Sequence, residues 1–387
     1  MDTALNVPTP AFLEDEDLAL YTDSLASFVE AEVAPHVERW EEDGQVDRAL
    51  WTQAGEAGLL VPSCPEAYGG AGADYRFDAA FIAALSGRGI EAWGAPLHHS
   101  IVAPYLWHYG TDEQKERYLP RMVAGDLIGA IAMTEPGAGS DLQGVKTTAL
   151  KDGNGYRLNG SKTFIINGQQ ANFIIVVAKT DPSAGAKGTS LMLVETDQVE
   201  GFRRGRNLDK VGLKGQDTSE LFFDDVFVPA DALLGGDAGR GFYQLMEQLP
   251  QERLQIALQG MAAIEYALSL TIDYVKERGA FGKKIIDFQN TQFTLAECKS
   301  EATIAKVFTQ HCLERLIKGE LDSATASMAK YWVTDLQNKI IDQCVQLHGG
   351  YGYMNEYPIA RMWRDARVQR IYGGTNEIMK LLIARTL

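Results

Sequence analysis

A glutamate stands among apolar residues in the segment "LPQERLQIA", residues 249–257. Glu252 is predicted to lie on the face that a helix buries, and Arg253, about 100° further around, is a poor intrahelical partner. Pro250 has no backbone N–H, so the helix is expected to begin or kink there. The residues that share the face of Glu252 recur every three or four positions: Leu245, Leu249, Ile256, Gly260 and Ile264.

Two interpretations of Glu252 are open from these residues alone. A glutamate in the first turn of a helix is commonly a surface charge, favoured by the helix dipole or paired with a remote arginine. A carboxylate that the helix buries has a raised pKa and can act as a general base. The rest of the chain must decide between a structural and a catalytic role.

The composition is typical of a globular protein with more than one domain. The chain has 387 residues, of which 45% are hydrophobic and 23% charged, enough for a large core in about two or three domains. The formal net charge of -16 argues against nucleic acid or an anionic membrane surface as a partner. No apolar run reaches the roughly 18 residues of a membrane-spanning helix, so no membrane span is expected.

Terminal segments and cysteines predict a cytoplasmic protein. The acidic start "MDTALNVPTPAFLEDEDLAL" has no basic segment followed by an apolar core, and the ending "ARTL" is not a peroxisomal address. The cysteines are dispersed without a C-x-x-C pair, which favours reduced core thiols; they are Cys64, Cys298, Cys312 and Cys344. No histidine spacing typical of a metal site occurs, so no metal is predicted.

Helical and strand-like patterns alternate only twice along the chain. Amphipathic helical patterns begin with residues 14–40 and include "TDEQKERYLPRMVAG", which starts with a Thr111 N-cap. From Gly129 to Pro229, β-branched and apolar runs alternate with turns such as "KDGNGY", which predicts strands and hairpins. Helical patterns then return over 242–277, 289–318, 321–347 and from Asn376.

The predicted fold class is therefore α+β, without the β–α alternation of a doubly wound sheet. We expect an N-terminal α-helical domain over residues 1–128, a middle β-barrel-like domain over 129–240 and a C-terminal four-helix bundle over 241–387.

Glycine-rich turns supply backbone donors without matching a nucleotide-binding fingerprint. "TEPGAGSD", residues 134–141, has Leu142 where the Rossmann loop needs a third small residue, and no βαβ unit surrounds it. As a turn it is either a plain tight loop or a donor of N–H and hydroxyl groups to an oxyanion or heterocycle. "QLHGGYGY" and "YGGTNE" are two further glycine turns, and the second precedes a helix beginning near Asn376.

Several of these segments together resemble the acyl-CoA dehydrogenase family, and within it the long-chain branch. The matching segments are "IAMTEPGAGSD", "NGSKTFIINGQQAN", "FVPADALLG", "RGAFGKKIIDFQNTQ", "VQLHGGYGYMNEYPIARMWRDARV" and "IYGGTNEIM", in the family's order. The resemblance implies the same α–β–α fold, bound FAD and a homotetramer. It also implies oxidation of acyl-CoA to trans-2-enoyl-CoA, with electrons leaving through an electron-transfer flavoprotein.

The resemblance assigns residues to the flavin and the substrate. Met133 and Thr134 would face the isoalloxazine ring, Phe164 would cover it, and Ser140 would lie near the pyrophosphate and the substrate. The matching positions of this chain are Ile131, Met133, Thr134, Gly139, Ser140, Phe164 and Ile166. Positions that reach a neighbouring subunit's FAD are matched by Arg278, Phe281, Gln289, Gln346, Gly349 and Gly350. Thr375 and Glu377 match the loop after the substrate site; Tyr243, Arg253, Gly373 and Gly374 match substrate contacts.

The resemblance also bears on Glu252. Many members carry the catalytic base in the loop corresponding to "YGGT", where this chain has Gly373, and a smaller set carries it at the position of Glu252. A missing loop glutamate and a buried helix carboxylate are complementary, so Glu252 is expected to be the base. It would take the α proton while flavin N5 accepts hydride from the β carbon. The Gly373 N–H and a ribityl hydroxyl would polarise the thioester oxygen.

One residue departs from the family pattern, and three alternative functions stay open. Ile166 replaces the serine or threonine whose hydroxyl commonly bonds flavin N5, which leaves the flavin potential unpredicted. An acyl-CoA oxidase, a flavin monooxygenase or a catalytically silent scaffold are the alternative functions. The acyl cavity is expected to be lined partly by residues 95–106; long straight chains are favoured, with branched and terpenoid chains as alternatives.

Overall fold

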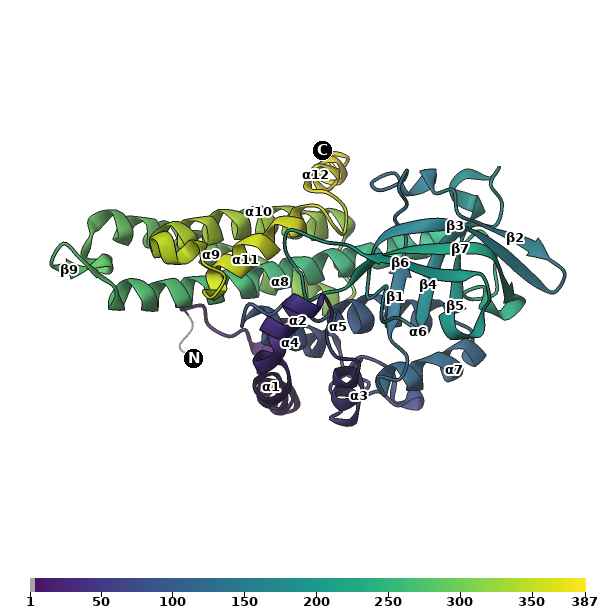
Figure 1. Cartoon of the computed structure of the whole chain (residues 1–387), viewed down its shortest axis with the longest axis horizontal. Helices are drawn as coiled ribbons and strands as arrows, with labels where there is room; N and C mark the ends of the chain where they lie inside the picture. The colour runs from purple at the N-terminus through teal and green to yellow at the C-terminus, as the bar shows by residue number, and fades with distance from the viewer. Residues whose placement is uncertain (1–3) are drawn as a thin grey trace.

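The computed structural model describes residues 4–387. A helical N-terminal region leads into a curled β-sheet, and long helices form the rest of the chain. Figure 1 shows the sheet at one end of the molecule and the long helices extending to the other, with the N-terminal helices along one side. This arrangement confirms the predicted α+β class and the helical–strand–helical order.

Short helices make up the N-terminal region. They are α1 Glu16–Phe28, α2 Val37–Asp43, α3 Ala49–Glu56, α4 Tyr75–Ser86, α5 Ala95–Leu97, α6 Ala103–Tyr109 and α7 Asp112–Val123. Thr111 caps α7, as predicted, and the structure adds a capping box with Gln114. The helix expected over 14–40 is instead interrupted between α1 and α2 by a π turn, Val29–Val33, and a 3₁₀ turn. Pro35 explains the break, because it cannot donate the next helical hydrogen bond.

The middle region is a twisted sheet. Its strands are β1 Gly129–Ala132, β2 Thr148–Asp152, β3 Gly155–Ile166, β4 Phe173–Lys179, β5 Thr189–Glu195, β6 Phe202–Asn207 and β7 Thr218–Pro229. Within residues 4–387 they form one seven-stranded sheet in the order β1–β4–β2–β3–β7–β6, with β5 paired to β4. Asp152 pairs with Gly155 across the β2–β3 turn, which is the hairpin predicted from "KDGNGY".

Long helices form the C-terminal region. They are α8 Gly241–Glu277, α9 Gln289–Ile317 and α10 Ser323–His348, followed by the shorter α11 Pro358–Ala366 and α12 Asn376–Ala384. α8 continues through Pro250, so the helix does not begin there. A small hairpin of β8 Gly279–Ala280 and β9 Lys283–Lys284 joins α8 to α9, at the end of the bundle remote from the sheet (Figure 1).

Two apolar clusters hold these regions together. One joins the N-terminal helices to the sheet, and the other fills the space between the C-terminal helices. All four cysteines are buried and free, in keeping with the prediction of core thiols. No helix within residues 4–387 combines the length and apolar character that crossing a bilayer requires.

Candidate active site

Glu252 lies on the buried face of α8, where its spacing predicted it. The residue is 6% exposed, and the hydroxyl of Tyr105 on α6 donates to its Oε1 at 2.8 Å. Arg253 turns instead to α10, where its Nη1 donates to Ser323 Oγ at 2.9 Å. The carboxylate therefore has a neutral donor. Arg253 forms its hydrogen bond elsewhere, in keeping with its predicted poor geometry as an intrahelical partner.

This environment brings Glu252 into the range of a general base. Burial raises the pKa of Glu252 to about 7, although the Tyr105 hydrogen bond and the charge of Arg253 act in the opposite direction. A base works best when its pKa lies near the operating pH. The surface-charge interpretation of Glu252 is therefore wrong for this fold.

The Gly373–Gly374 turn packs against the same face of α8. A Cβ at Gly373 would lie 2.2 Å from Cδ1 of Ile256, which follows Glu252 by one helical turn. The two glycines have φ of 63° and 90°, in the left-handed region that glycine tolerates. Within residues 4–387 the N–H of Gly373 donates no hydrogen bond. The carboxylate on α8 and the free backbone donor of the turn are thus both neighbours of Ile256.

The other proposed substrate contacts lie on α8 and beside it. Tyr243 near the start of α8 is 45% exposed, and the Arg240 guanidinium lies 5.6 Å from its ring centroid. Arg253 is buried, and its Nε has no hydrogen-bond partner. These positions put an exposed aromatic side chain and a buried cation on the helix that carries Glu252.

Phe164 occupies an unusual place in β3. The pairing of β3 with β7 shifts register between Lys162 and Ile165, and Phe164 in that bulge has φ of 61° and is 66% exposed. Bulges of this kind redirect side chains near functional sites. The amide of Thr163 donates to the carbonyl of Thr134 at 2.9 Å, and this bond ties the bulge to the Met133–Thr134 turn.

These residues fit the flavin that the sequence implied. Phe164 is exposed in the bulge that is bonded to the Met133–Thr134 turn. Met133 and Thr134 are half-buried, and Gly139 and Ser140 are exposed. An aromatic shelf next to a small-residue turn suits a flat ring system with a polar tail. Ile131 is buried in β1, and Ile166 at the end of β3 is half-buried.

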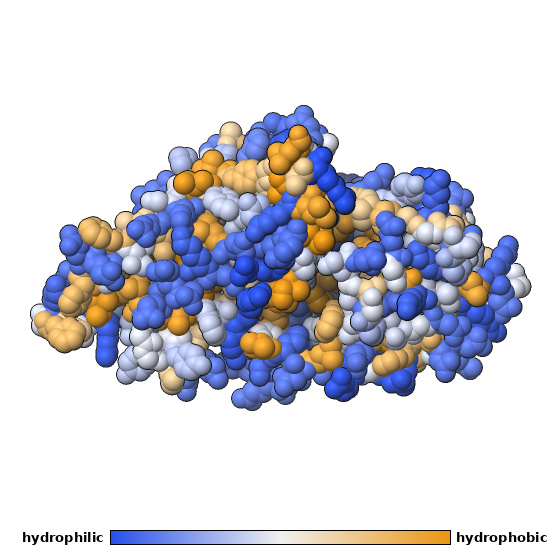
Figure 2. Space-filling view, turned by 90° about the horizontal axis from the view of Figure 1, so that it is seen from above, coloured by the Kyte–Doolittle hydropathy of each residue, from blue (hydrophilic) through white to orange (hydrophobic). Residues whose placement is uncertain are grey.

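The second set of predicted cofactor residues lies elsewhere. Arg278 and Phe281 flank the β8–β9 hairpin, and the Arg278 guanidinium is 5.4 Å from the ring of Tyr351. This contact joins them to the turn after α10, so the residues gather at the β9 end of the bundle, remote from strand β3 that carries Phe164 (Figure 1). They are Arg278, Phe281, Gln289, Gln346, Gly349 and Gly350. Phe281 is 95% exposed, and Figure 2 shows apolar surface at this end of the molecule. One chain therefore does not unite the two sets.

Thr375 and Glu377 lie at the start of α12. Thr375 caps the helix by accepting from the amide of Ile378 at 3.4 Å. Glu377 is exposed, and its own backbone N–H holds its pKa below the usual value. An exposed carboxyl with a lowered pKa is a poor general base, so Glu377 is a weak rival to Glu252.

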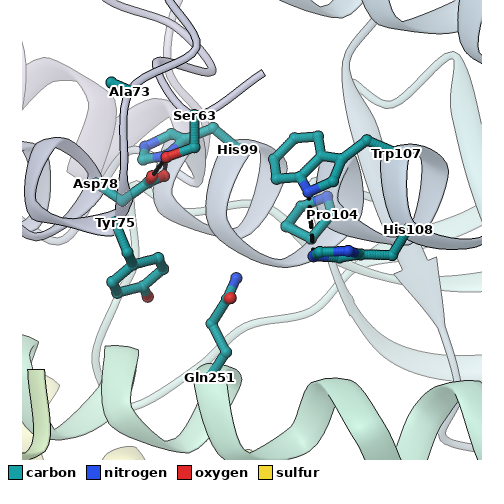
Figure 3. A pocket seen from close by; sticks show the side chains of 9 residues that line it. All are labelled: Ser63, Ala73, Tyr75, Asp78, His99, Pro104, Trp107, His108 and Gln251. Atoms are coloured by element: carbon teal, nitrogen blue, oxygen red, sulfur yellow. Dashed lines mark hydrogen bonds and ion pairs between the residues drawn. The ribbon is translucent and has the colours of Figure 1, made fainter. Parts of the chain in front are cut away.

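A cavity of about 190 Å³ lies between residues of the N-terminal region and Gln251 of α8. Figure 3 shows Tyr75 on one side of it, Trp107 and His108 on the other, and Gln251 rising from α8. Its wall includes Asp78, whose Oδ1 lies 2.7 Å from His99 Nδ1. Some lining residues belong to the predicted 95–106 segment, but the polar wall is unlike the apolar lining that a long alkyl chain requires.

Tyr105 is the residue of this site that sequence reasoning missed. It is 147 residues from Glu252 in the chain, and in the sequence it is one aromatic among the apolar residues of a short helix. Its only available signal was its place inside the 95–106 segment expected to line the cavity.

Comparisons with known proteins agree across the chain. Models of the acyl-CoA dehydrogenase N-terminal, middle and C-terminal domains match residues 15–126, 130–226 and 239–387. The mitochondrial long-chain specific acyl-CoA dehydrogenase of Sus scrofa is 51% identical over 370 residues, 95% of this chain and 86% of that protein. An acyl-CoA dehydrogenase of Bacillus subtilis is 40% identical over 93% of this chain and 95% of its own length.

Solved structures show the same relationship. The crystal structure of acyl-CoA dehydrogenase from Geobacillus kaustophilus matches with a TM-score of 0.95 at 48% identity, over 98% of this chain and 99% of that one. The agreement extends over all three regions described above. The chain therefore belongs to the acyl-CoA dehydrogenase family.

Proposed function

We propose that the protein is an FAD-dependent acyl-CoA dehydrogenase that converts acyl-CoA to trans-2-enoyl-CoA. The observation that carries this proposal is that buried Glu252 lies one helical turn before Ile256, and that Ile256 packs against the Gly373 turn with its free N–H. A thioester α proton is weakly acidic, so its removal needs a base and a donor to the carbonyl oxygen together.

In the proposed reaction each residue of the site has a separate role. Glu252 accepts the α proton, and the Tyr105 hydroxyl holds Oε1 and thereby orients the carboxylate. The Gly373 N–H donates to the thioester oxygen, so it stabilises the negative charge that forms as the proton leaves. Ile256, 5% exposed, shields the carboxylate from water, which keeps its pKa raised.

FAD, when bound, would accept a hydride from the β carbon. Phe164, Met133 and Thr134 would hold its ring system, and Ser140 would lie near its pyrophosphate. An electron-transfer flavoprotein is the proposed electron acceptor. A homotetramer is the proposed assembly. The remote position of Arg278 and Phe281 supports an oligomer, because another subunit would be needed to bring such residues to a flavin at Phe164.

The proposed substrates are long straight-chain acyl-CoAs, supported by the 51% identity to a long-chain specific relative. Each buried CH₂ contributes about 0.8 kcal/mol, so kcat/KM measured over a panel of increasing chain length should rise until the cavity ends. Branched and terpenoid acyl-CoAs belong in the same panel.

Mixing the purified flavoprotein with acyl-CoA without air tests the proposed function. A dehydrogenase and an oxidase are both bleached, whereas only the oxidase recolours quickly when air is admitted. A monooxygenase without use for the base, or a silent scaffold, is not bleached at all. Absence of bleaching over the whole acyl-CoA panel would therefore overturn the proposal.

The activity should depend on pH through Glu252. The carboxylate form is the base, so kcat/KM is expected to fall as pH drops through about 7, the raised pKa of Glu252. Tyr105→Phe removes a hydrogen bond that favours the carboxylate, worth about 1.5–3 kcal/mol for a charged acceptor. The acidic limb should then move upward by roughly one to two pH units. A limb that stays in place in Tyr105→Phe would assign the ionisation to another group.

Ile166→Thr should change the redox properties of the flavin and leave acyl-CoA binding nearly unchanged. A hydroxyl at this position could bond flavin N5, which the native side chain cannot do. We expect a shifted flavin potential and an altered rate of reduction, measured by redox titration and stopped flow, with little change in acyl-CoA affinity. If potential and rate both match those of the unchanged protein, a backbone donor already fills this role.

A further inference from the structure

Lys330 is a fully buried lysine on α10 that reaches the Gly373–Gly374 turn. It is 0% exposed. Its Nζ donates to the carbonyl of Gly374 at 2.7 Å and to Oδ1 of Asn376 at 3.0 Å. Its partners are therefore a backbone carbonyl and a side-chain amide on the two sides of Thr375.

The charge of Lys330 is costly to bury in this place. Burial, together with the charge of Arg253, lowers the pKa of Lys330 to about 7. The carboxylates of Asp335 and Glu377 act in the opposite direction on this pKa, but the hydrogen-bond partners of Lys330 are uncharged. The bond to Gly374 restricts the orientation of that carbonyl, and the bond to Asn376 holds the ammonium in place.

The turn that Lys330 holds has few other constraints. Before it, the amide of Tyr372 donates to the carbonyl of Val368 at 3.1 Å; after it, Thr375 caps α12. Between these anchors lie Gly373 and Gly374, both at positive φ, and successive glycines have the greatest backbone freedom to lose. The bond from Lys330 falls within this flexible pair.

The side chain of Asn376, which accepts from Lys330, is itself held by further hydrogen bonds. Its Nδ2 donates to Asp335 Oδ1 and to Thr334 Oγ1, each at 3.0 Å. Asp335 forms an ion pair with Arg370 at 2.6 Å. A chain of contacts therefore runs from this ion pair through Asn376 and Lys330 to the Gly374 carbonyl.

We propose that Lys330 is a positioning residue, which holds the Gly373–Gly374 turn so that the Gly373 N–H faces the thioester oxygen. This inference rests on the proposed function, since it assigns a support to the donor of that reaction. Lys330 touches the turn and not the reacting atoms, so it acts through Gly373.

Lys330→Met tests the proposal, because methionine keeps an unbranched chain of similar size and loses the donor. The rate of flavin reduction at saturating acyl-CoA should fall by about 10- to 100-fold, as for a misplaced oxyanion donor. FAD content, acyl-CoA affinity and the unfolding midpoint should change little. Lys306→Met is the matched control: it removes a lysine of the same bundle that contacts Glu265 at 2.6 Å and not the turn.

Vibrational difference spectra of bound trans-2-enoyl-CoA supply a readout that a purely structural role would not move. The thioester carbonyl stretch should be shifted by the unchanged protein and by Lys306→Met, and the shift should shrink in Lys330→Met. If Lys330→Met does not accumulate folded, Lys330→Gln serves instead: it keeps an amide donor one bond shorter and should lose part of the rate and of the shift.

The outcomes separate this inference from the proposed function. If the unchanged protein is bleached by acyl-CoA and the folded Lys330 variants show its full rate and carbonyl shift, the positioning role is overturned. If the unchanged protein is not bleached by any acyl-CoA, the proposed function itself fails.

Discussion

Glu252→Gln is expected to slow flavin reduction by acyl-CoA by about 10²–10⁴-fold or more, the contribution of a positioned general base. Glutamine keeps the shape of the side chain and an oxygen for the Tyr105 hydroxyl, but it cannot accept the α proton. FAD content and acyl-CoA binding should therefore survive. Anaerobic stopped-flow bleaching measures the rate without interference from reoxidation.

Glu247→Gln is a matched control for this variant. Glu247 lies on the same helix, is exposed, and accepts a hydrogen bond from Tyr109 at 2.9 Å, so it repeats the tyrosine–glutamate contact outside the site. Its loss should leave bleaching close to normal. Near-normal bleaching in Glu252→Gln would contradict the assignment of Glu252 as the base, and Glu377 would be the next residue to replace.

Moving the base from helix to loop should restore part of the activity. In Glu252→Gly with Gly373→Glu, a carboxylate starts from the turn and approaches the same α carbon. Two features limit the gain: a glutamate at φ of 63° is strained, and its Cβ would meet Ile256 Cδ1. Ile256→Val removes that atom at a cost of about 0.5–1.5 kcal/mol of stability. We expect bleaching rates to rise from Glu252→Gly to the double and then to the triple variant.

Full activity is not expected, since a misplacement of about 1 Å can cost about 10²-fold. Ile256→Val alone is the control, and it should bleach at nearly the normal rate because Glu252 is still present. A triple variant no faster than Glu252→Gly would mean that the two backbone origins do not reach the same carbon.

Local patterns were sufficient for much of the fold. The Thr111 cap, the "KDGNGY" hairpin and the buried face of α8 each depend on residues close together in the chain, so spacing and turn chemistry predicted them. The position of Glu252 on that face belongs to the same class, because helical periodicity alone decides which residues share a face.

Long-range contacts were beyond that reasoning. Tyr105 meets Glu252, Ile256 fills the space above Gly373, and Lys330 reaches the Gly374 carbonyl, in each case across distant parts of the chain. A lone lysine in a helical pattern ordinarily predicts a solvated position, so the burial of Lys330 had no local signal. Arg278 and Phe281 lie remote from Phe164, and their predicted role stays a prediction.

The π turn His98–Val102, just before α6, has a consequence for comparing relatives. Its hydrogen bonds span five residues instead of four, so the turn accommodates one residue more than a regular α-helix would. A relative that is α-helical throughout this stretch reaches the place of Tyr105 one position earlier in its own numbering. An ungapped alignment would then assign the tyrosine's role to a neighbour about 100° around the helix, whose side chain faces away from the base. The placement of a single gap within residues 95–109 therefore decides whether the donor to Glu252 is found in another member of the family.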